Sequence, residues 1–310
     1  TNNTVKTNTL GGISLTNSTA NITGNTVSEN QGIGISINDA NGNTFSGNTV
    51  SGNSNSGLVI SGNNNSLISN SFTGNAGLGI SITSGTGNQI TNNAVGTNTL
   101  GGISLSNSTG NITGNTVTGI LIFGIYLNAS GGNTLSENEI SGNSSDGLII
   151  NGSNNAINDN TIYNNGISGI GTGVFVESGN NNSILNNSIY SNSVLGTKLN
   201  DSANDSQQFP TLNIFYTWQD ETALPEIKGG TSVQGILHSI PNQNYKIQFF
   251  ANPSLNQREG KRYLGETVVT TDIAGEADFI ANLKDAVLTN DEVISASATK
   301  LDINNNPLST

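Results

Sequence analysis

Three acidic residues near the middle of the chain have the type and spacing that could do chemistry. Glu137 and Asp159 each come directly before an asparagine and are separated by 22 residues, the length of a repeat in this chain. Carboxylates stacked about 5 Å apart would raise one another's pKa or recruit a cation such as Ca²⁺. Glu139, two residues after Glu137, could join them. The group is a candidate Ca²⁺ site or glycosidase pair; the competing interpretation is solvated acids on a polar exterior.

Other chemistry is limited by the residue types that the chain lacks. It contains no Cys and no Met, which excludes disulfides, thiol chemistry and cysteine-based metal sites. The single histidine, His238, is interpreted as an ordinary strand residue. Lys6 and Lys198 are the only basic residues of the first 200 and lie at opposite ends of that region. We therefore expect a protein that is not an enzyme, with no cofactor other than Ca²⁺ at the acidic residues.

Aromatic residues form a second candidate site in the later part of the same region. Tyr163 and Tyr190 could stack on sugar rings, or could pack against a following domain. A column of outward residues becomes apolar at Tyr126, Ile149 and Phe175, and the apolar stretch 120–123 lies near it. An exposed apolar patch of that size predicts a partner surface. The partner could be the second domain, a neighbouring subunit or a ligand.

All of these residues belong to a repeated sequence. Residues 1–27 and 91–117 are identical at 23 of 27 positions. Within this long repeat, the pattern glycine–apolar–any–apolar recurs every 22 or 23 residues, with one interval of 26. The pattern begins at Gly12, Gly34, Gly57, Gly79, Gly102, Gly124, Gly147 and Gly173, and in degenerate form at Gly196. Apolar residues two apart put both side chains on one face of a strand.

Each repeat also carries an asparagine just before a strand. These asparagines are Asn3, Asn25, Asn48, Asn70, Asn93, Asn115, Asn138, Asn160 and Asn187. Strands this short cannot bury a face alone, so each must pair with its equivalent one repeat away, about 4.8 Å along a common axis. The asparagines would lie at a bend, where Asn tolerates the left-handed region, and their amides could bond along the column as a ladder. The sequence therefore predicts an all-β fold, a right-handed parallel β-helix of about nine coils.

The composition changes after the β-helix, which we place at residues 1–200. All five prolines follow it. Residues 201–225 are predicted to be a linker and seam, and residues 226–310 a small antiparallel β-sandwich of immunoglobulin-like type. The residues expected to cover the last coil are Phe209, Phe215 and Trp218. The expected strands of the sandwich are Ser232–His238, Tyr245–Phe250, Thr267–Thr271, Glu276–Ala281 and Glu292–Thr299. This unit could close the apolar end of the β-helix, or could be loosely tethered to it.

The net charge of the chain limits the kinds of partner that it can bind. Nine Lys and Arg face 21 Asp and Glu, for a net charge of −12. Nothing resembles a basic face, so we expect no nucleic acid partner, and anionic membranes and polyanionic sugars are disfavoured. The sequence contains no apolar run of about 18 residues, so we do not expect membrane insertion. The Cys-free, Asn/Ser/Thr/Gly-rich composition favours an extracellular protein of the bacterial cell surface. Because the chain opens inside a repeat and without Met, we expect a mature or excised piece of a longer protein.

The repeats also carry a family resemblance. Segments such as Asn-Thr-Val-Ser-Gly-Asn and Gly-Ile-Ser-Ile resemble the bacterial surface parallel β-helix repeat proteins of pectate-lyase-like fold. The stretch 205–272 is similar to a module that closes many large bacterial surface β-helix proteins. The resemblance implies an architecture, because this fold carries lyases, hydrolases, epimerases, adhesins and fibres. Its lyases need a Ca²⁺-binding Asp cluster and an Arg or Lys base, yet residues 1–257 contain no Arg.

Our preferred prediction is a non-catalytic structural or adhesive surface protein, whose β-helix is a stiff rod that could self-assemble into a filament or sheath. Duplicated coils lengthen a rod, whereas an enzyme site needs unique residues at one place. The alternative is a carbohydrate-binding or carbohydrate-active β-helix. A third reading is ice binding, because outward Thr and Ser form two ranks, although Ala94, Gly96 and Glu139 interrupt them. The expected partners are other copies of the chain or cell-surface glycans.

Overall fold

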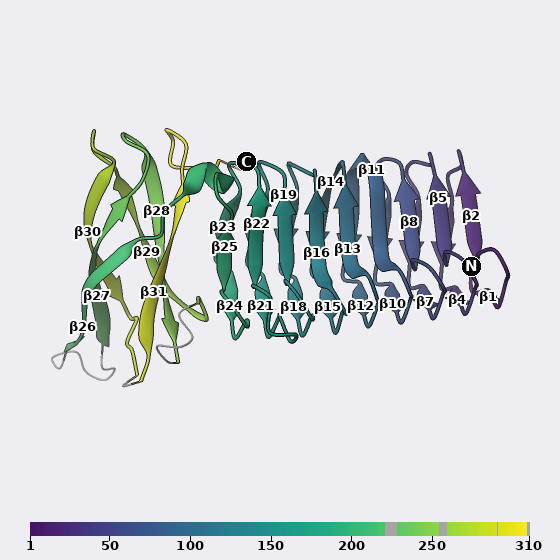
Figure 1. Ribbon diagram of the computed structural model, residues 1–310, viewed down its shortest axis with the longest axis horizontal. Coiled ribbons are helices and arrows are strands. Elements are labelled where there is room, and N and C mark those ends of the chain that lie inside the picture. Colours follow the sequence, from purple (N-terminus) through teal and green to yellow (C-terminus); the bar gives the residue numbers. More distant parts are fainter. Residues whose placement is uncertain (221–227, 254–258, 290, 309–310) are drawn as a thin grey trace.

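Short parallel strands wind through the first 199 residues, and two antiparallel sheets follow them (Figure 1). The computed structural model describes residues 1–220, 228–253, 259–289 and 291–308. The coils lie side by side along one axis, and the C-terminal unit stands at the end of the last coil (Figure 1). The predicted all-β architecture, with about nine coils, is confirmed.

Three strand positions recur in every complete coil, and they build three faces. The first sheet contains β1 Thr4–Lys6, β4 Thr26–Ser28, β7 Thr49–Ser51, β10 Ser71–Thr73, β12 Ala94–Gly96, β15 Thr116–Thr118, β18 Glu139–Ser141, β21 Thr161–Tyr163 and β24 Ser188–Tyr190. The second sheet contains β2 Ile13–Thr16, β5 Ile35–Asn38, β8 Leu58–Ser61, β11 Leu78–Thr91, β13 Gly101–Ser106, β16 Phe123–Asn128, β19 Leu148–Asn151, β22 Val174–Ser178 and β25 Thr197–Leu199. The third sheet contains β3 Asn21–Thr23, β6 Thr44–Ser46, β9 Ser66–Ile68, the end of β11, β14 Ser108–Thr113, β17 Thr134–Ser136, β20 Ala156–Asn158 and β23 Ser183–Leu185.

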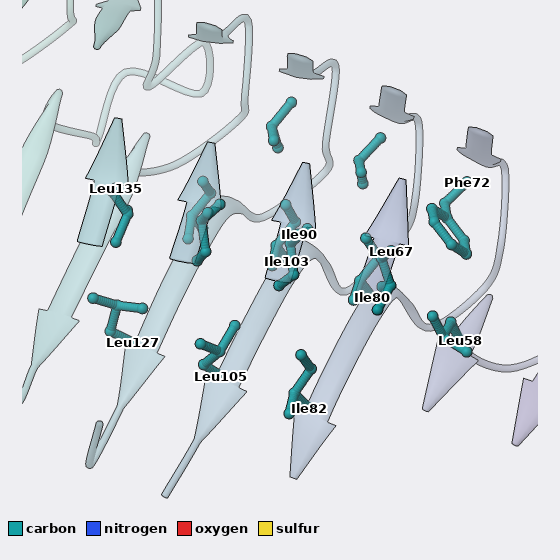
Figure 2. Close-up of a cluster of buried hydrophobic side chains, with 14 of the residues drawn as sticks. Leu58, Leu67, Phe72, Ile80, Ile82, Ile90, Ile103, Leu105, Leu127 and Leu135 are labelled. Carbon is teal, nitrogen blue, oxygen red and sulfur yellow. The ribbon is translucent and has the colours of Figure 1, made fainter. Parts of the chain in front are cut away.

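The register places each apolar residue above its equivalent in the next coil. Val27 pairs with Val50, and Ile35 pairs with Leu58. Because side chains alternate along a strand, one set points inward and forms a continuous stack of aliphatic and Phe side chains. Figure 2 shows part of this stack, including Ile80 and Ile103, both fully buried. Stacking of the coils buries one face of each short strand. This burial explains why the β-branched and aromatic residues of the repeat form strands.

Asparagine ladders run along all three corners of the coil. The first ladder is the predicted one, from Asn3 to Asn187. The second contains Asn8, Asn30, Asn53, Asn75, Asn98, Asn143, Asn165 and Asn192, and is interrupted by Ile120. The third contains Asn43, Asn65, Asn88, Asn133, Asn155, Asn182 and Asn204, and is interrupted by Gly110.

One rung shows how a ladder works. The side-chain Nδ2 of Asn48 donates to Oδ1 of Asn70 at 2.8 Å and to the backbone carbonyl of Ile22 at 2.7 Å. The backbone N–H of Asn48 donates to the same Oδ1 at 2.9 Å. Each buried amide thus satisfies backbone groups that the turning chain cannot pair within a sheet.

The left-handed residues of the first corner are not the ladder asparagines, which corrects our expectation. The residue before each rung has positive φ instead, and this set includes Ser69, Asn92, Glu137 and Asp159 beside several glycines. Each ladder asparagine keeps its side-chain amide inside the corner. The residue before it therefore adopts the left-handed conformation that bends the chain. Exposed positions with φ near 55° tolerate Gly, Asn, Asp and some other polar residues.

The C-terminal unit consists of two three-stranded antiparallel sheets. One contains β26 Thr211–Asp220, β27 Lys228–His238 and β30 Glu276–Lys284; the other contains β29 Arg262–Thr270, β28 Asn244–Asn252 and β31 Val293–Lys300. Tyr245, Ile247, Phe249 and Val233 are buried between them. The five predicted strands are present, and the immunoglobulin-like assignment stays a prediction. His238 lies at the exposed end of β27, where Nδ1 is 3.3 Å from Glu276.

The predicted linker and seam at 201–225 is described up to residue 220, and residues 221–225 lie outside the described part of the chain. The described part of this segment contains a short 3-10 helix, η1 Ala203–Ser206, and strand β26 Thr211–Asp220, which pairs with β27. The run of aromatic and apolar residues in this segment forms a strand because β27 offers an antiparallel edge. In the ranges that the structure describes, no helix is long and apolar enough to cross a membrane.

We expect Asn93→Ala to lower the free energy of unfolding by about 3 kcal/mol, because several buried groups lose their partners at once. Asn93 accepts bonds from the backbone and side chain of Asn70 and donates to Asn115 and to the carbonyl of Leu67. Urea unfolding followed by circular dichroism measures the change. Asn111→Ala, at an exposed strand position, is the control and should change stability by less than about 0.5 kcal/mol. Equal effects of the two substitutions would contradict the structural role of the ladder.

Candidate functional site

The predicted outward column that becomes apolar lies on the outside of the second sheet, in the late coils. Tyr126 of β16, Ile149 of β19 and Phe175 of β22 are in register and half-buried. The next residue in the column is Lys198 of β25, whose Nζ lies 4.9 Å from the centre of the Phe175 ring. The predicted alignment of this column is confirmed. Its members follow one another along the axis of the β-helix, one from each coil.

Glu177 is a member of this surface that we did not predict. Its Oε2 accepts a hydrogen bond from the Tyr126 hydroxyl at 3.1 Å and another from the side-chain amide of Asn151 at 3.3 Å. Burial raises the pKa of Tyr126, and the nearby charge of Glu177 raises it further. The signal was available, because Glu177 follows Phe175 by two and therefore points outward from the same strand. We call Tyr126, Ile149, Asn151, Phe175, Glu177 and Lys198 the late face.

The late face continues into an exposed apolar corner. Phe123 contacts the ring of Tyr126 edge to face, with centroids 5.5 Å apart. Leu121 and Ile122 follow the first sheet at the turn and are 60% and 43% exposed. Ile120 differs from our expectation for this loop: it is buried, because it occupies the place of an asparagine in the second ladder. The exposed surface therefore begins at Leu121.

The two predicted tyrosines stack on the outside of the first sheet. The rings of Tyr163 and Tyr190 are 5.1 Å apart and inclined by 5°, and Lys261 of the C-terminal unit lies 5.0 Å from the centre of the Tyr190 ring. The Tyr163 hydroxyl donates to Oε1 of Glu139 at 2.6 Å, and this bond raises the pKa of Tyr163. Tyr190 thus has a neighbour on each face within the chain, which matches packing against the second domain better than an open platform for a sugar.

These surfaces are carried by a fold with known relatives. The family model described as a right handed beta helix region matches residues 1–121 and 57–210. The chain belongs to this right-handed β-helix family. No curated protein matches the chain in sequence.

Solved β-helix structures resemble the chain at low identity. The tailspike protein gp208 of Dettilon is 15% identical, with a TM-score of 0.50 over 90% of this chain and 72% of that one. The A-module of mannuronan C-5 epimerase AlgE4 from Azotobacter vinelandii is 18% identical, with a TM-score of 0.49 over 58% of this chain. The match spans 56% of the epimerase module, so little more than half of its length. At these identities the likeness concerns the fold.

The predicted Ca²⁺ residues lie at two separate places in the β-helix. Glu137 and Asp159 are exposed at equivalent turns of adjacent coils, both with positive φ, so their stacked placement matches the prediction. Glu139 instead bonds Tyr163 on the outside of the first sheet. Within the described ranges, no three His, Asp or Glu side chains gather in a group that could hold a metal ion. The site stays a prediction that depends on the Glu137–Asp159 pair.

The seam between the β-helix and the C-terminal unit is formed by polar groups. Gly260 exchanges two backbone hydrogen bonds with Ile189, at 2.9 and 2.8 Å. Gln248 bonds the backbone and side chain of Asn186. The backbone carbonyl of Lys261 accepts from Ser188, and Lys300 pairs with Asp205 at 3.0 Å.

The aromatic residues that we expected at the seam do not fill it. Phe209 and Phe215 are 77% and 46% exposed, and the side chain of Trp218 lies outside the described part of the structure. Phe215 lies on β26, whose partner β27 belongs to the sheet farther from the last coil (Figure 1). The covering contacts come instead from the segment at residues 259–261 and from β28, which belongs to the sheet beside the coil.

Glu259 ends the second asparagine ladder. Its carboxylate accepts the backbone N–H of Asn192 at 3.1 and 3.3 Å, the position that the amide oxygen of a further asparagine would take. Burial raises the pKa of Glu259, and the bonds from Asn192 oppose this only in part. Ionisation of Glu259 is therefore harder in the folded protein than in the unfolded chain.

We expect Glu259→Gln to stabilise the protein at neutral pH, because the amide keeps an acceptor for Asn192 without a buried charge. A carboxyl whose pKa is raised by folding destabilises the folded state as pH increases. The advantage of the variant should therefore appear above pH 4.5, the ordinary value, and level off once Glu259 is ionised. Urea unfolding from pH 4 to pH 8 measures it. Asp278→Asn, at an exposed acid of β30, is the control; an advantage that does not vary with pH would contradict this account.

Proposed function

We propose that the chain is a non-catalytic structural protein of the extracellular surface, in which the β-helix is a stiff spacer that carries the C-terminal unit. The observation that supports this most is the direction of the outward interactions. Tyr126 reaches Glu177 across 51 residues of sequence, which is two coils, and Tyr163 stacks on Tyr190 of the next coil. The outward Tyr and Glu side chains, which are the groups best suited to bind a ligand, thus connect coils to one another along the axis.

The interior supports the same role. The three ladders and the stacked aliphatic core join every coil to its neighbours, so that bending the rod would strain hydrogen bonds at three corners together. A repeat protein of this kind gains stability from each neighbouring interface. A rod fits an adhesive surface protein, because it separates a terminal contact unit from its attachment. The composition, rich in Asn, Ser, Thr and Gly and free of Cys, accords with a location at the bacterial cell surface.

A double-mutant cycle tests the axial role of the late face. We expect Tyr126→Phe and Glu177→Ala to be coupled by about 0.5–1.5 kcal/mol in the free energy of unfolding, since they remove one shared hydrogen bond. The control pair is Tyr126→Phe with Asp159→Ala, which lies at another corner and should be additive. Urea unfolding of the four proteins in each cycle gives the values. If Tyr126 and Glu177 prove additive, the late face does not stiffen the rod.

Carbohydrate binding is a second candidate, favoured by the polar and apolar groups that meet on the late face. Glu177 has a second carboxylate oxygen that could accept from a sugar hydroxyl. Phe175, Ile149 and the exposed Leu121 offer apolar surface beside it. The net charge of −12 favours a neutral glycan over a polyanion.

Affinity electrophoresis tests this second candidate. In native gels containing the neutral polysaccharide galactomannan, a binding protein migrates more slowly than in plain gels. We expect Phe175→Ala to lose the retardation, with an affinity loss of about tenfold, because it removes a large contact surface. Val59→Ala, at the equivalent outward position of β8, should be retarded like the unchanged protein. Equal retardation of both variants would place any glycan site elsewhere, and no retardation would remove this candidate for galactomannan.

A further inference from the structure

The three sheets of the β-helix end differently at the last coil. The edge of the first sheet, at β24, is taken by the backbone of Gly260. The edge of the third sheet, at β23, faces β31 of the C-terminal unit. The edge of the second sheet is β25 Thr197–Leu199, which pairs with β22 and with no other strand in the described parts of the chain. Among the described residues, β25 is therefore the one edge that has no strand partner on its outer side, although Glu259 packs against Gly196 just before it.

The open edge presents backbone groups in strand geometry. On the side of the preceding coil, the Gly196 carbonyl accepts from Val174 and the Asn200 N–H donates to Val176, at 2.8 and 2.9 Å. Because consecutive residues of a strand turn their N–H and C=O groups to opposite sides, Thr197 must turn its groups to the free side. Leu199 does the same, two residues later.

A large cleft lies next to this edge. Its volume is about 1240 Å³, and β25 forms one wall while β31 and the segment at 207–215 form others. Ile184, Leu199 and Ile294 contribute apolar lining, with Ala296 and Ala298 beside them. Small-molecule sites usually occupy roughly 300–1,000 Å³. The cleft is thus large enough for a stretch of polypeptide, and its walls are apolar where inward side chains would point.

We propose that β25 binds an extended peptide segment of another protein, which adds to the second sheet as a further parallel strand and lines the cleft with its apolar residues. Free backbone groups give such a strand its affinity, and pockets for alternate side chains give it selectivity. The partner sequence would therefore alternate apolar and polar residues, as the strands of the coils do.

The closed edges exclude a complete coil as the occupant. A second copy of the chain would need all three sheet edges to stack its first coil on the last one, as successive coils stack within the β-helix. Gly260 and β31 occupy two of these edges. The remaining opening is one strand wide, which fits a single extended segment. The inference does not depend on the proposed spacer role.

The test uses a peptide that copies residues 171–180, which contain β22, with a fluorescent label. In the β-helix, Val174 and Val176 of this segment point inward, so it has the required alternation. We expect saturable binding to the complete chain, measured by fluorescence anisotropy. Thr197→Pro removes the backbone N–H of Thr197, which lies on the free side of β25, and should weaken peptide binding by at least about tenfold. Thr197→Ala keeps this N–H and should bind the peptide within about twofold of the affinity of the unchanged protein. Circular dichroism checks that both variants are folded.

A pair of modified peptides keeps the test independent of protein folding. Within β22, Val174 and Val176 turn their backbone groups toward β25, so Phe175 turns its N–H toward the preceding coil. On β25, the peptide would therefore use the N–H of Phe175. N-methylation at Phe175 should abolish binding, and N-methylation at Val176 should preserve it. The proposal is overturned if the unmodified peptide fails to saturate, or if these modifications have equal effects. A concentration-dependent doubling of mass without peptide binding would assign the edge to a second copy and would also overturn it.

Discussion

The buried side-chain amide at each corner of the coil is the interaction on which the rest of the structure depends. A chain that turns every few residues leaves backbone N–H and C=O groups that no sheet can pair, and burying them unpaired would cost about 1–3 kcal/mol each. The asparagine amide has the donor and acceptor groups to satisfy them, and it can also bond the next amide in the column. Only then can strands of three or four residues stack and bury an aliphatic core. Ile120 and Gly110 show that a ladder tolerates an interruption when the coils on both sides are intact.

The β-helix could be predicted from sequence because its physical period is written directly in the residues. Glycine–apolar–any–apolar and the first asparagine column gave the coil length, the inward face and the number of coils. The second and third ladders were missed for identifiable reasons. Asn8 and its equivalents have no fixed apolar neighbour, and the third ladder is absent from the first coil, where Ala20 stands in place of an asparagine. The C-terminal strands were found by alternation, whereas β26 was read as linker because its pairing partner comes later in the chain.

The outer surface was harder to interpret, because an outward residue has no period that separates a binding group from a packing group. Tyr126, Phe175 and Tyr190 were correctly placed outward, but their contacts with Glu177, Lys198 and Lys261 depend on side-chain length and on the distance between coils. The seam could not be predicted for a related reason. Glu259 and Gly260 come from an irregular segment with no repeat, and only the folded arrangement brings them to the last coil.

The asparagine ladders also give the β-helix a dipole along its axis. Where a column is uninterrupted, each side-chain amide donates to the amide oxygen of the following coil, so the dipoles point the same way along the axis and add, as peptide dipoles do in an α-helix. The last coil is the positive end of these columns, because the donors of each coil point toward the coil that follows it. Glu259 places a carboxylate at that end, on the N–H of Asn192. The cost of burying this acid is thus partly offset by a field that the whole column creates, so an acidic group suits this end of the rod where a basic group would not.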